Sequence, residues 1–284
     1  MIPAQFEYQA PSTVDEAVAA LAAGGDDAKV LAGGQSLLPV LRMRLADPQL
    51  VVDLGGIAEL RGVREEDDSL VIGAMTTHHD VQRDPLVQQH AELIALTTRT
   101  VADPQVRHRG TFGGALAHAD PAGDLPAPAL ALDAELVLAG PGGRRAVPAQ
   151  DFFTDLFSTA LGPAEVLVQV RLPKRTGWRA HYEKFNRVAQ AWSIAGVAVA
   201  LRVAGGRIEQ ARVGLTNMGP VPVRARGVEE ALVGESADER TVRAAARRAT
   251  EGTAPAADAS ADVDYRSHLA EVLTGRAVLA AATG

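Results

Sequence analysis

The stretch "KVLAGGQSLLPVLRMRL", residues 29–45, places two glycines, an amide and a hydroxyl between an apolar run and a segment with helical spacing. Glycine weakens a strand, because it has no side chain to pack and loses more backbone entropy on folding than other residues. We therefore expect Gly33 and Gly34 to serve the backbone. The pattern predicts that another group comes close to the chain here.

A second stretch of this kind is "DPQVRHRGTFGGALAHADPAGDLPA", residues 103–127, with Thr111 directly before Phe112 and a second glycine pair. Glycines let backbone N–H groups point at phosphate oxygens without interference from a Cβ atom. Ser36 and Thr111 can each donate one further hydrogen bond. We interpret the two stretches as two walls of a site for an anionic group.

The alternative is that both glycine pairs are ordinary turns. The chain has 27 glycines, and four other pairs are read as turns, namely those beginning at Gly24, Gly55, Gly142 and Gly205. Neither stretch is a Walker loop, and no G-x-G-x-x-G motif follows a strand. The residues alone therefore indicate a candidate anion site.

Composition restricts the classes of function. The chain has 284 residues with 47% hydrophobic and 22% charged residues, no cysteine and a net charge of −7. Scattered basic residues argue against a nucleic-acid partner, and the absence of cysteine excludes disulfides, thiolate zinc sites and iron–sulfur clusters within this chain. No apolar run approaches the roughly 20 residues of a membrane span, and the first residues do not resemble a signal peptide. We expect a cytoplasmic protein.

The hydrophobic pattern predicts a β-loop-α-β unit at the start. A helix is expected from a cap at Ser12 or Thr13 to Gly24, followed by strands at residues 29–34 and 49–56. A hairpin turning at residues 65–69 and a helix broken near Pro85 come next. Further on, we expect a hairpin around residues 140–143 and an edge strand that ends at Pro173.

The pattern changes near residue 178, where two long strands are expected to join at Gly205 and Gly206. Helices at about 227–234, 238–251 and 264–282 follow. The fold class is α+β, with three predicted parts at residues 1–56, 57–176 and 177–284.

Several motifs together resemble those of one known family. They are "KVLAGGQSLLPVLRMRL", "VVDLGGI", "IGAMTTHHDV", "DPQVRHRGTFGGALAHADPAGDLPA" and "YEKFNR". In this order they resemble the FAD-binding medium subunit of the molybdenum hydroxylases, especially the carbon monoxide dehydrogenase type, over essentially the whole chain. The resemblance implies a PCMH-type FAD-binding fold, similar to vanillyl-alcohol oxidase. It would have a small N-terminal subdomain, a larger mixed subdomain and a C-terminal sheet-plus-helices domain like that of carbon monoxide dehydrogenase flavoproteins.

The resemblance also implies that the FAD pyrophosphate lies between the two glycine stretches. Family positions for cofactor binding map here to Val30, Leu31, Ala32, Gly33, Gly34, Gln35, Ser36, Leu37, Ala102, Thr111, Phe112, Gly113, Gly114, Ala115 and His118. Two positions depart from the family pattern, because Ala115 is usually Asn or Ser and Phe112 is usually Ile. A side-chain hydrogen bond is expected to be lost at residue 115, while backbone donors remain.

Other family positions map outside the glycine stretches. Asp124 would accept a hydrogen bond from the flavin imide, although a turn or cap aspartate is the alternative. Lys184 would stabilise negative charge on a reduced flavin, unless it is a solvated lysine at a strand end. Val166 and Leu167 would form an apolar wall or simply belong to the core. Trp192 would lie on a mobile segment near the ring or be structural.

No metal site and no catalytic residue are assigned. His78 and His79 are adjacent and are predicted to form an exposed pair at a helix start, because neighbours on a helix point about 100° apart. Arg107 and Arg109 would either compensate phosphate charge or pair with Asp103 and Asp120.

The resemblance implies two partner subunits. A small subunit would hold two iron–sulfur clusters of the 2Fe–2S type, and a large subunit would hold a molybdenum–pterin site. Electrons would pass through the clusters to FAD in this chain and leave to an external acceptor, and the heterotrimer is expected to form a dimer. The lack of cysteine separates the chain from hydroxybenzoyl-CoA reductases, whose flavin subunit binds a further cluster. The alternatives are a stand-alone FAD oxidase or dehydrogenase and a flavin-free assembly scaffold.

Overall fold

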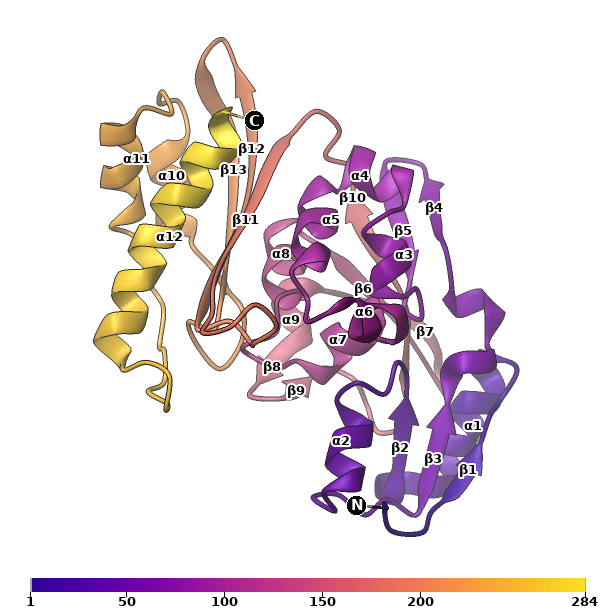
Figure 1. Ribbon diagram of the computed structural model, residues 1–284. Helices are drawn as coiled ribbons and strands as arrows, with labels where there is room; N and C mark the ends of the chain where they lie inside the picture. The colour runs from indigo at the N-terminus through magenta and orange to yellow at the C-terminus, as the bar shows by residue number, and fades with distance from the viewer. Residues whose placement is uncertain (1, 284) are drawn as a thin grey trace.

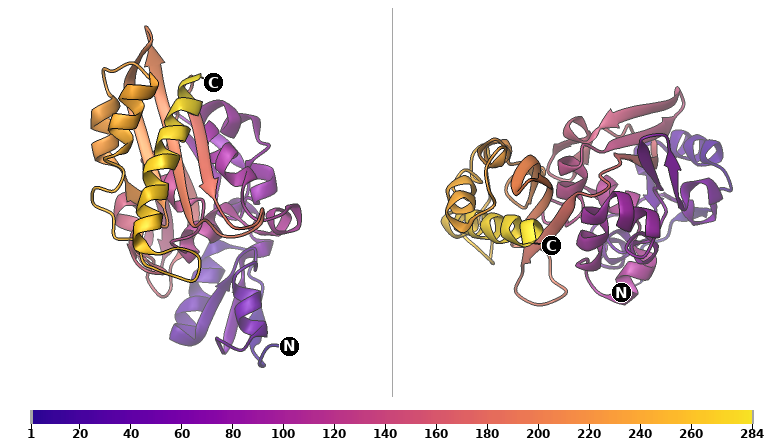
Figure 2. Two further views of the ribbon diagram at one scale, coloured as in Figure 1. Left: turned by 60° about the vertical axis from the view of Figure 1, so that its left-hand side comes forward. Right: turned by 90° about the horizontal axis from the view of Figure 1, so that it is seen from above.

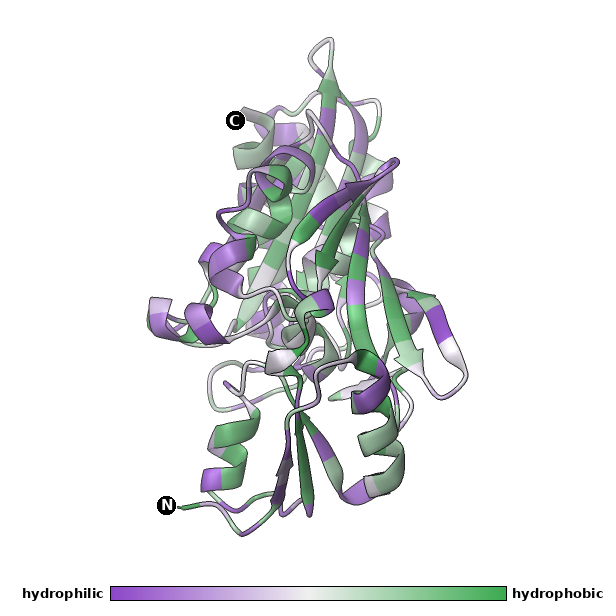
Figure 3. Ribbon diagram, turned by 90° about the vertical axis from the view of Figure 1, so that its right-hand side faces the viewer, coloured by the Kyte–Doolittle hydropathy of each residue, from purple (hydrophilic) through white to green (hydrophobic). Residues whose placement is uncertain are grey.

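The computed structural model describes residues 2–283 and is built around three main sheets, which follow one another along the chain. Figure 1 shows the N-terminal part at the lower right, the helix-rich middle part in the centre and the C-terminal part at the left. Figure 3 shows hydrophobic residues concentrated along the inner strands and hydrophilic residues on the outer turns.

The N-terminal sheet is a parallel three-stranded sheet with strand order β1-β3-β2. Thr13 and Glu16 form a capping box at the start of α1, whose apolar stripe is buried against the sheet. The predicted β-loop-α-β unit is confirmed. The elements are β1 (Glu7–Gln9), α1 (Val14–Gly24), η1 (Gly25–Asp27), β2 (Ala28–Leu31), α2 (Leu37–Arg42), β3 (Leu50–Asp53), η2 (Leu54–Gly56) and η3 (Ala58–Leu60).

The middle sheet is antiparallel, with strand order β4-β5-β10-β6-β7. Both predicted hairpins are confirmed. The expectation that the strand ending at Pro173 is an edge strand is wrong, because β10 pairs with β5 on one side and β6 on the other. Pro173 is tolerated there because it is the last residue of the strand. The strands are β4 (Val63–Glu66), β5 (Ser69–Gly73), β6 (Glu135–Gly140), β7 (Gly143–Pro148) and β10 (Val166–Pro173).

Short helices cover this sheet, and three of them have proline in the first turn. Proline is tolerated there because a backbone N–H group in the first turn has no acceptor within the helix. The predicted break near Pro85 is confirmed, because α3 ends at Val81 and α4 begins at Pro85. The elements are α3 (His78–Val81), α4 (Pro85–His90), α5 (Glu92–Arg99), α6 (Pro104–Arg109), α7 (Phe112–His118), α8 (Pro126–Ala131), α9 (Ala149–Phe152), β8 (Phe153–Asp155) and β9 (Ser158–Thr159).

The C-terminal sheet has strand order β11-β12-β13-β14 and lies between two layers of helices (Figures 1 and 2). The three C-terminal helices cover its outer face, while α5 and α8 lie against the other face. The two long strands joined at Gly205 and Gly206 are confirmed, whereas β11 and β14 were not expected. The elements are β11 (Arg179–Phe185), β12 (Ala195–Ala204), β13 (Arg207–Thr216), β14 (Val223–Arg224), α10 (Arg226–Leu232), α11 (Glu239–Ala246) and α12 (Val263–Thr283).

The seam between the middle and C-terminal parts is tightly packed. Tyr182, Ala198 and Ala200 of the C-terminal sheet belong to the same buried cluster as the middle helices. At Gly214 of β13, a Cβ atom would lie 2.4 Å from the backbone oxygen of Ala127 in α8. Only glycine lets the helix and the strand approach to this distance.

We expect Gly214→Ala to lower the free energy of unfolding by about 1–3 kcal/mol, because the added methyl group overpacks the seam. Denaturant-induced unfolding followed by circular dichroism measures the change. Gly142→Ala is the matched control, since no atom lies within 4 Å of its added Cβ, and it should change stability by less than about 1 kcal/mol. Equal midpoints for the two variants would show that the seam accommodates the methyl group.

Candidate functional site

The first glycine segment, residues 32–36, connects β2 to α2 and carries unused hydrogen-bond donors. Within residues 2–283, no backbone or side-chain acceptor takes a hydrogen bond from the amides of Gly33, Gly34, Gln35 or Ser36. Gly34 has φ of +74°, a conformation that favours glycine. Successive backbone N–H groups without partners form a concave donor surface suited to an anion.

The first glycine segment lies in direct contact with the second glycine segment, residues 110–115. A Cβ atom on Gly33 would be 2.3 Å from the backbone oxygen of Arg109 and 2.6 Å from the Cα atom of Gly110. A Cβ atom on Gly114 would be 3.2 Å from the Cβ atom of Ala32. The group that approaches Gly33 is therefore first of all the backbone of the second segment, so the fold brings together the two walls proposed from sequence.

The second segment is held by residues 74–78, which belong to the family motif "IGAMTTHHDV" but were not predicted to contact the glycines. Phe112 N donates to Thr76 O at 2.9 Å, Gly113 N donates to Ala74 O at 2.8 Å, and His78 N donates to Gly110 O at 2.9 Å. A Cβ atom on Gly113 would lie 2.4 Å from that of Ala74. The run "GAMTTH" thus positions the second segment, although the sequence pattern did not predict this role.

The donors of the second segment are largely used within the protein. Thr111 caps α7 by accepting a hydrogen bond from Gly114 N at 3.2 Å, and Ala115 N donates to Thr111 O at 3.0 Å. The expectation that backbone donors remain in this segment is therefore wrong, because the amides of residues 112–115 all donate within the protein. The hydroxyl proton of Thr111 is still available to a ligand. The first segment therefore supplies the backbone donors of the candidate site, and the second segment mainly packs against the first and holds it in place.

His78 is buried, and its predicted exposure is wrong. Its side chain lies against Gly110, where a Cβ atom would be 2.8 Å from the ring, and its Nδ1 atom has no hydrogen-bond partner among residues 2–283. Burial, assisted by the positive charge of Arg107, lowers the pKa of His78 to about 4. His79 is accessible and stacks on His108 with ring centroids 3.8 Å apart. The histidines therefore do not form the predicted surface pair.

The arginines before the second segment do not pair with the predicted aspartates. Arg107 donates to the backbone oxygens of Val101 at 2.7 Å and Ala102 at 3.1 Å. Asp103 instead caps α6, and Asp120 accepts from Ala122 N at 2.9 Å. Arg107 thus supports the turn at Ala102, which has φ of +41°. Arg109 is exposed and has no ion-pair partner in the described part of the chain.

Asp124 and Lys184 form a buried ion pair across the seam. Lys184 Nζ lies 2.8 Å from Asp124 Oδ2, and the two side chains are only 8% and 5% exposed. Tyr182 Oη and Ser193 Oγ donate to Asp124 Oδ1 at 2.8 and 2.7 Å. The alternatives of a turn aspartate and a solvated lysine are therefore wrong. Sequence reasoning also missed Tyr182 and Ser193, because their partners are distant in the chain.

The network is electrically balanced and retains one donor. Burial and the neighbouring Asp124 raise the pKa of Tyr182 well above its ordinary value, so its hydroxyl stays protonated. Lys184 donates to Asp124 Oδ2 and to Thr100 O at 3.3 Å. An ammonium group has three donors. One N–H group of Lys184 therefore has no acceptor among residues 2–283 and is available to a ligand beside Thr100.

The other predicted site residues lie in different environments. Val166 and Leu167 are buried in two different core clusters, which is consistent with their alternative role in the core. His118 lies near the exposed Phe157, with ring centroids 5.3 Å apart. Trp192 is 58% exposed on the loop between β11 and β12. Val30, Leu31 and Leu37 flank the first segment and are partly buried.

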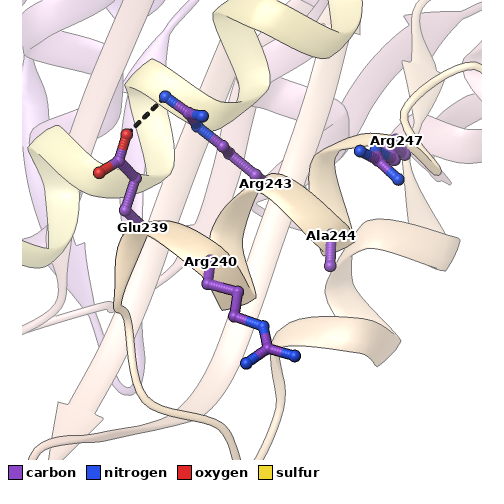
Figure 4. Close-up of a pocket in the computed structure, with 5 residues that line it drawn as sticks. All are labelled: Glu239, Arg240, Arg243, Ala244 and Arg247. Atoms are coloured by element: carbon purple, nitrogen blue, oxygen red, sulfur yellow. Dashed lines mark ion pairs between the residues drawn. The ribbon is translucent and has the colours of Figure 1, made fainter.

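A shallow depression lies elsewhere, on the outer side of the C-terminal part. All the residues that line it belong to α11 or follow it directly, and Glu239 forms an ion pair of 2.5 Å with Arg243 (Figure 4). It is one charged helix face rather than a cofactor cavity. No group of three or more His, Asp or Glu side chains within residues 2–283 is arranged to hold a metal ion. No helix among these residues is long and apolar enough to cross a bilayer.

The fold and the amide-lined segment define a class of protein, namely an α+β protein whose candidate anion site lies outside a Rossmann fold. Residues 4–175 match the FAD binding domain in molybdopterin dehydrogenase, and residues 180–281 match the CO dehydrogenase flavoprotein C-terminal domain. This chain belongs to the family of FAD-binding medium subunits of the molybdenum hydroxylases, and it is a subunit of an oxidoreductase of that type.

Relatives and solved structures agree over the full length. The carbon monoxide dehydrogenase medium chain of Hydrogenophaga pseudoflava is 45% identical over 99% of this chain and 98% of its own length. The glyceraldehyde dehydrogenase medium chain of Sulfolobus acidocaldarius is 34% identical, with 98% of each chain covered. A structure of the H. pseudoflava carbon monoxide dehydrogenase superposes with a TM-score of 0.96 at 46% identity, covering 99% and 98%. The structure of quinoline 2-oxidoreductase of Pseudomonas putida 86 superposes with a TM-score of 0.95 at 36% identity, and the match covers 100% of this chain and 99% of the other. The predicted PCMH-type fold is thereby confirmed.

We expect acid to destabilise the protein through His78. Because the pKa of His78 is about 4 when folded and near 6.5 when unfolded, the unfolded chain binds more protons between these values. Stability should therefore fall as pH falls from 6.5 to 4, by up to about 3 kcal/mol from this group. His78→Gln should flatten this part of the pH–stability curve, measured by denaturant unfolding, whereas the accessible His79→Gln should not. An unchanged slope in His78→Gln would contradict a buried neutral histidine.

Proposed function

We propose that this chain binds FAD between residues 32–36 and 111–115 and is the subunit from which electrons leave a three-subunit molybdenum hydroxylase. The observation that carries the proposal is the run of four amides at Gly33–Ser36 that find no acceptor among residues 2–283 and are held against the second segment. Such a donor set suits the diphosphate of a dinucleotide cofactor.

The residues fit FAD by their chemistry. The amides of residues 33–36 and the Thr111 hydroxyl would hold the two phosphates, and the lack of a side chain at Gly114 lets the second segment pack against Ala32. The free N–H group of Lys184 would donate to the flavin end and favour negative charge there. When bound, FAD accepts and releases electrons. In this arrangement the Asp124 carboxylate holds Lys184 and is not itself the acceptor for the flavin imide.

The lack of cysteine supports a division of labour between subunits. A chain without thiolates holds no iron–sulfur cluster, so the clusters that deliver electrons would belong to a small partner subunit. The molybdenum–pterin site would belong to a large partner subunit, where the substrate is oxidised. This chain then binds its cofactor and transfers electrons to an external acceptor.

We further propose carbon monoxide as the substrate of the complex. Two carbon monoxide dehydrogenase medium chains are 45% and 40% identical to this chain, whereas relatives named for glyceraldehyde, 6-hydroxypseudooxynicotine, nicotine or caffeine are 32–34% identical. The residues of this chain do not contact the molybdenum substrate in the proposed arrangement. The substrate therefore has to be tested on the complex.

Gly33→Ala should reduce the FAD content of the co-expressed three-subunit complex at least about tenfold, because a Cβ atom 2.3 Å from Arg109 O separates the two segments. Flavin is measured by absorbance after acid release, and molybdenum and iron by elemental analysis. Gly142→Ala is the matched control and should retain full FAD. A Gly33→Ala complex with stoichiometric FAD would refute the proposal that residues 32–36 and 111–115 together form the FAD site, here called the cradle.

The wild-type complex should reduce an artificial dye with carbon monoxide as the electron source, and the flavin-depleted variant should keep its metals but lose dye reduction. Bleaching of flavin in this chain alone by a substrate would instead favour a stand-alone oxidase. A wild-type complex that is active without any flavin would favour an assembly scaffold. Dye reduction with a purine or an aldehyde but not with carbon monoxide would overturn the assigned substrate alone.

A further inference from the structure

The loop between β11 and β12, residues 186–193, projects from the C-terminal sheet (Figure 2, right). Within the loop, Asn186 Nδ2 donates to Val188 O at 2.7 Å and Ala191 N donates to Val188 O at 2.9 Å. The side chains of Val188 and Trp192 are 67% and 58% exposed. No hydrogen bond within residues 2–283 joins residues 187–192 to another element. The position of the loop is therefore set where it meets the sheet.

The end of the loop after Trp192 is tied from several directions. Ser193 is 2% exposed, its Oγ atom donates to Asp124 Oδ1 at 2.7 Å, and its backbone oxygen accepts from Asn217 Nδ2 at 2.8 Å. Ile194 N donates to Phe185 O at 2.8 Å, which closes the loop. The buried Arg266 donates to Ile194 O. Of these bonds, only that from the Ser193 hydroxyl reaches the middle part of the protein.

Asp124 belongs to the segment that follows the second glycine pair. This segment is tied to the C-terminal part a second time, because Asn217 N donates to Pro121 O at 2.9 Å. We propose that Ser193 is a positioning residue, whose hydrogen bond to Asp124 fixes the Trp192 loop relative to the second glycine segment. The two elements then move together, and a displacement of either one is transmitted to the other.

The charge of Asp124 makes this bond stronger than a bond between neutral groups. Hydrogen bonds to an ionised carboxylate are roughly twice as strong as neutral ones. Oδ2 of Asp124 is occupied by Lys184, so Oδ1 is the oxygen left for the hydroxyls. An amide at this position would turn its NH₂ group either toward Lys184 or toward the two hydroxyl donors. A carboxylate is thus needed to hold the lysine and the loop at once.

Tyr182 provides an internal comparison for Ser193. Both side chains donate to the same oxygen, Asp124 Oδ1, at 2.8 and 2.7 Å. Tyr182 lies within β11, whereas Ser193 lies at the end of the loop. Removing either hydroxyl costs Asp124 one donor, but only removal of the Ser193 hydroxyl also removes the hydrogen bond between the loop and the middle part of the protein. The two deletions therefore separate loop positioning from a general weakening of the buried network.

The test uses the full-length chain with Trp178→Phe. The chain has two tryptophans, so this substitution leaves Trp192 as the single tryptophan fluorophore. Time-resolved fluorescence anisotropy reports the nanosecond motion of Trp192. In Ser193→Ala, the amplitude of this fast motion should increase about twofold. Tyr182→Phe should leave it at the value of the Trp178→Phe parent, and Ser193→Thr, which keeps the hydroxyl, should restore it.

Equal amplitudes in Ser193→Ala and the parent would overturn the proposal, and so would an equal increase in Ser193→Ala and Tyr182→Phe. Far-UV circular dichroism verifies folding. If Ser193→Ala does not fold, Ser193→Cys keeps a side chain of similar size with a weak donor, and it is held to the same criteria. The experiment requires neither FAD nor a partner subunit, so it is independent of the proposed function.

Discussion

The close contact between Gly33 and the backbone of Arg109 and Gly110 is the constraint on which the candidate site depends. A single methyl group at Gly33 would lie 2.3 Å from a carbonyl oxygen, a separation that real structures do not sustain. Because the contact joins two segments some 75 residues apart in the sequence, it aligns the N-terminal sheet with α7. The amides of residues 33–36, which have no acceptor among residues 2–283, belong to the segment that this contact holds in place.

A second constraint is the burial of charge where the middle and C-terminal parts meet. Lys184 and Asp124 are both buried, and an isolated buried ion costs several kcal/mol. Each therefore requires the other, and Tyr182 and Ser193 complete the shell of donors around the carboxylate. This network links the end of the second glycine stretch to the C-terminal sheet. It explains how a domain without a glycine cradle of its own contributes to the candidate site.

The arrangement also shows how an α+β protein prepares a phosphate site without the long helix of a Rossmann fold. The α2 and α7 helices are short, and the Thr111 cap already satisfies amides at the start of α7. The donors come instead from an irregular segment with one residue at positive φ. Such a segment keeps its amides unpaired only because neighbouring backbone holds it in place, and the contact at Gly33 provides that support.

Much of the local structure could be predicted from sequence, because it depends on near neighbours. The capping box at Thr13, the helix break at Pro85 and the turn at Gly205 and Gly206 are such cases. The five motifs, taken in order along the chain, also sufficed to predict the family and its PCMH-type fold. The environments of Asp124, Lys184 and His78 could not be predicted, since their partners lie in distant elements.

The sequence by itself therefore determined the secondary structure of most elements, the absence of any thiolate chemistry and the two segments that form the candidate cradle. Tertiary structure alone decided that β10 is central rather than an edge strand, and that the backbone of Arg109 and Gly110 packs against Gly33. It also decided that Asp124 accepts hydrogen bonds from Lys184 and Ser193. The physical reason is range. Propensities, caps and turns act over a few residues, whereas strand pairing, close packing and the neutralisation of buried charge depend on groups that meet only after the chain has folded.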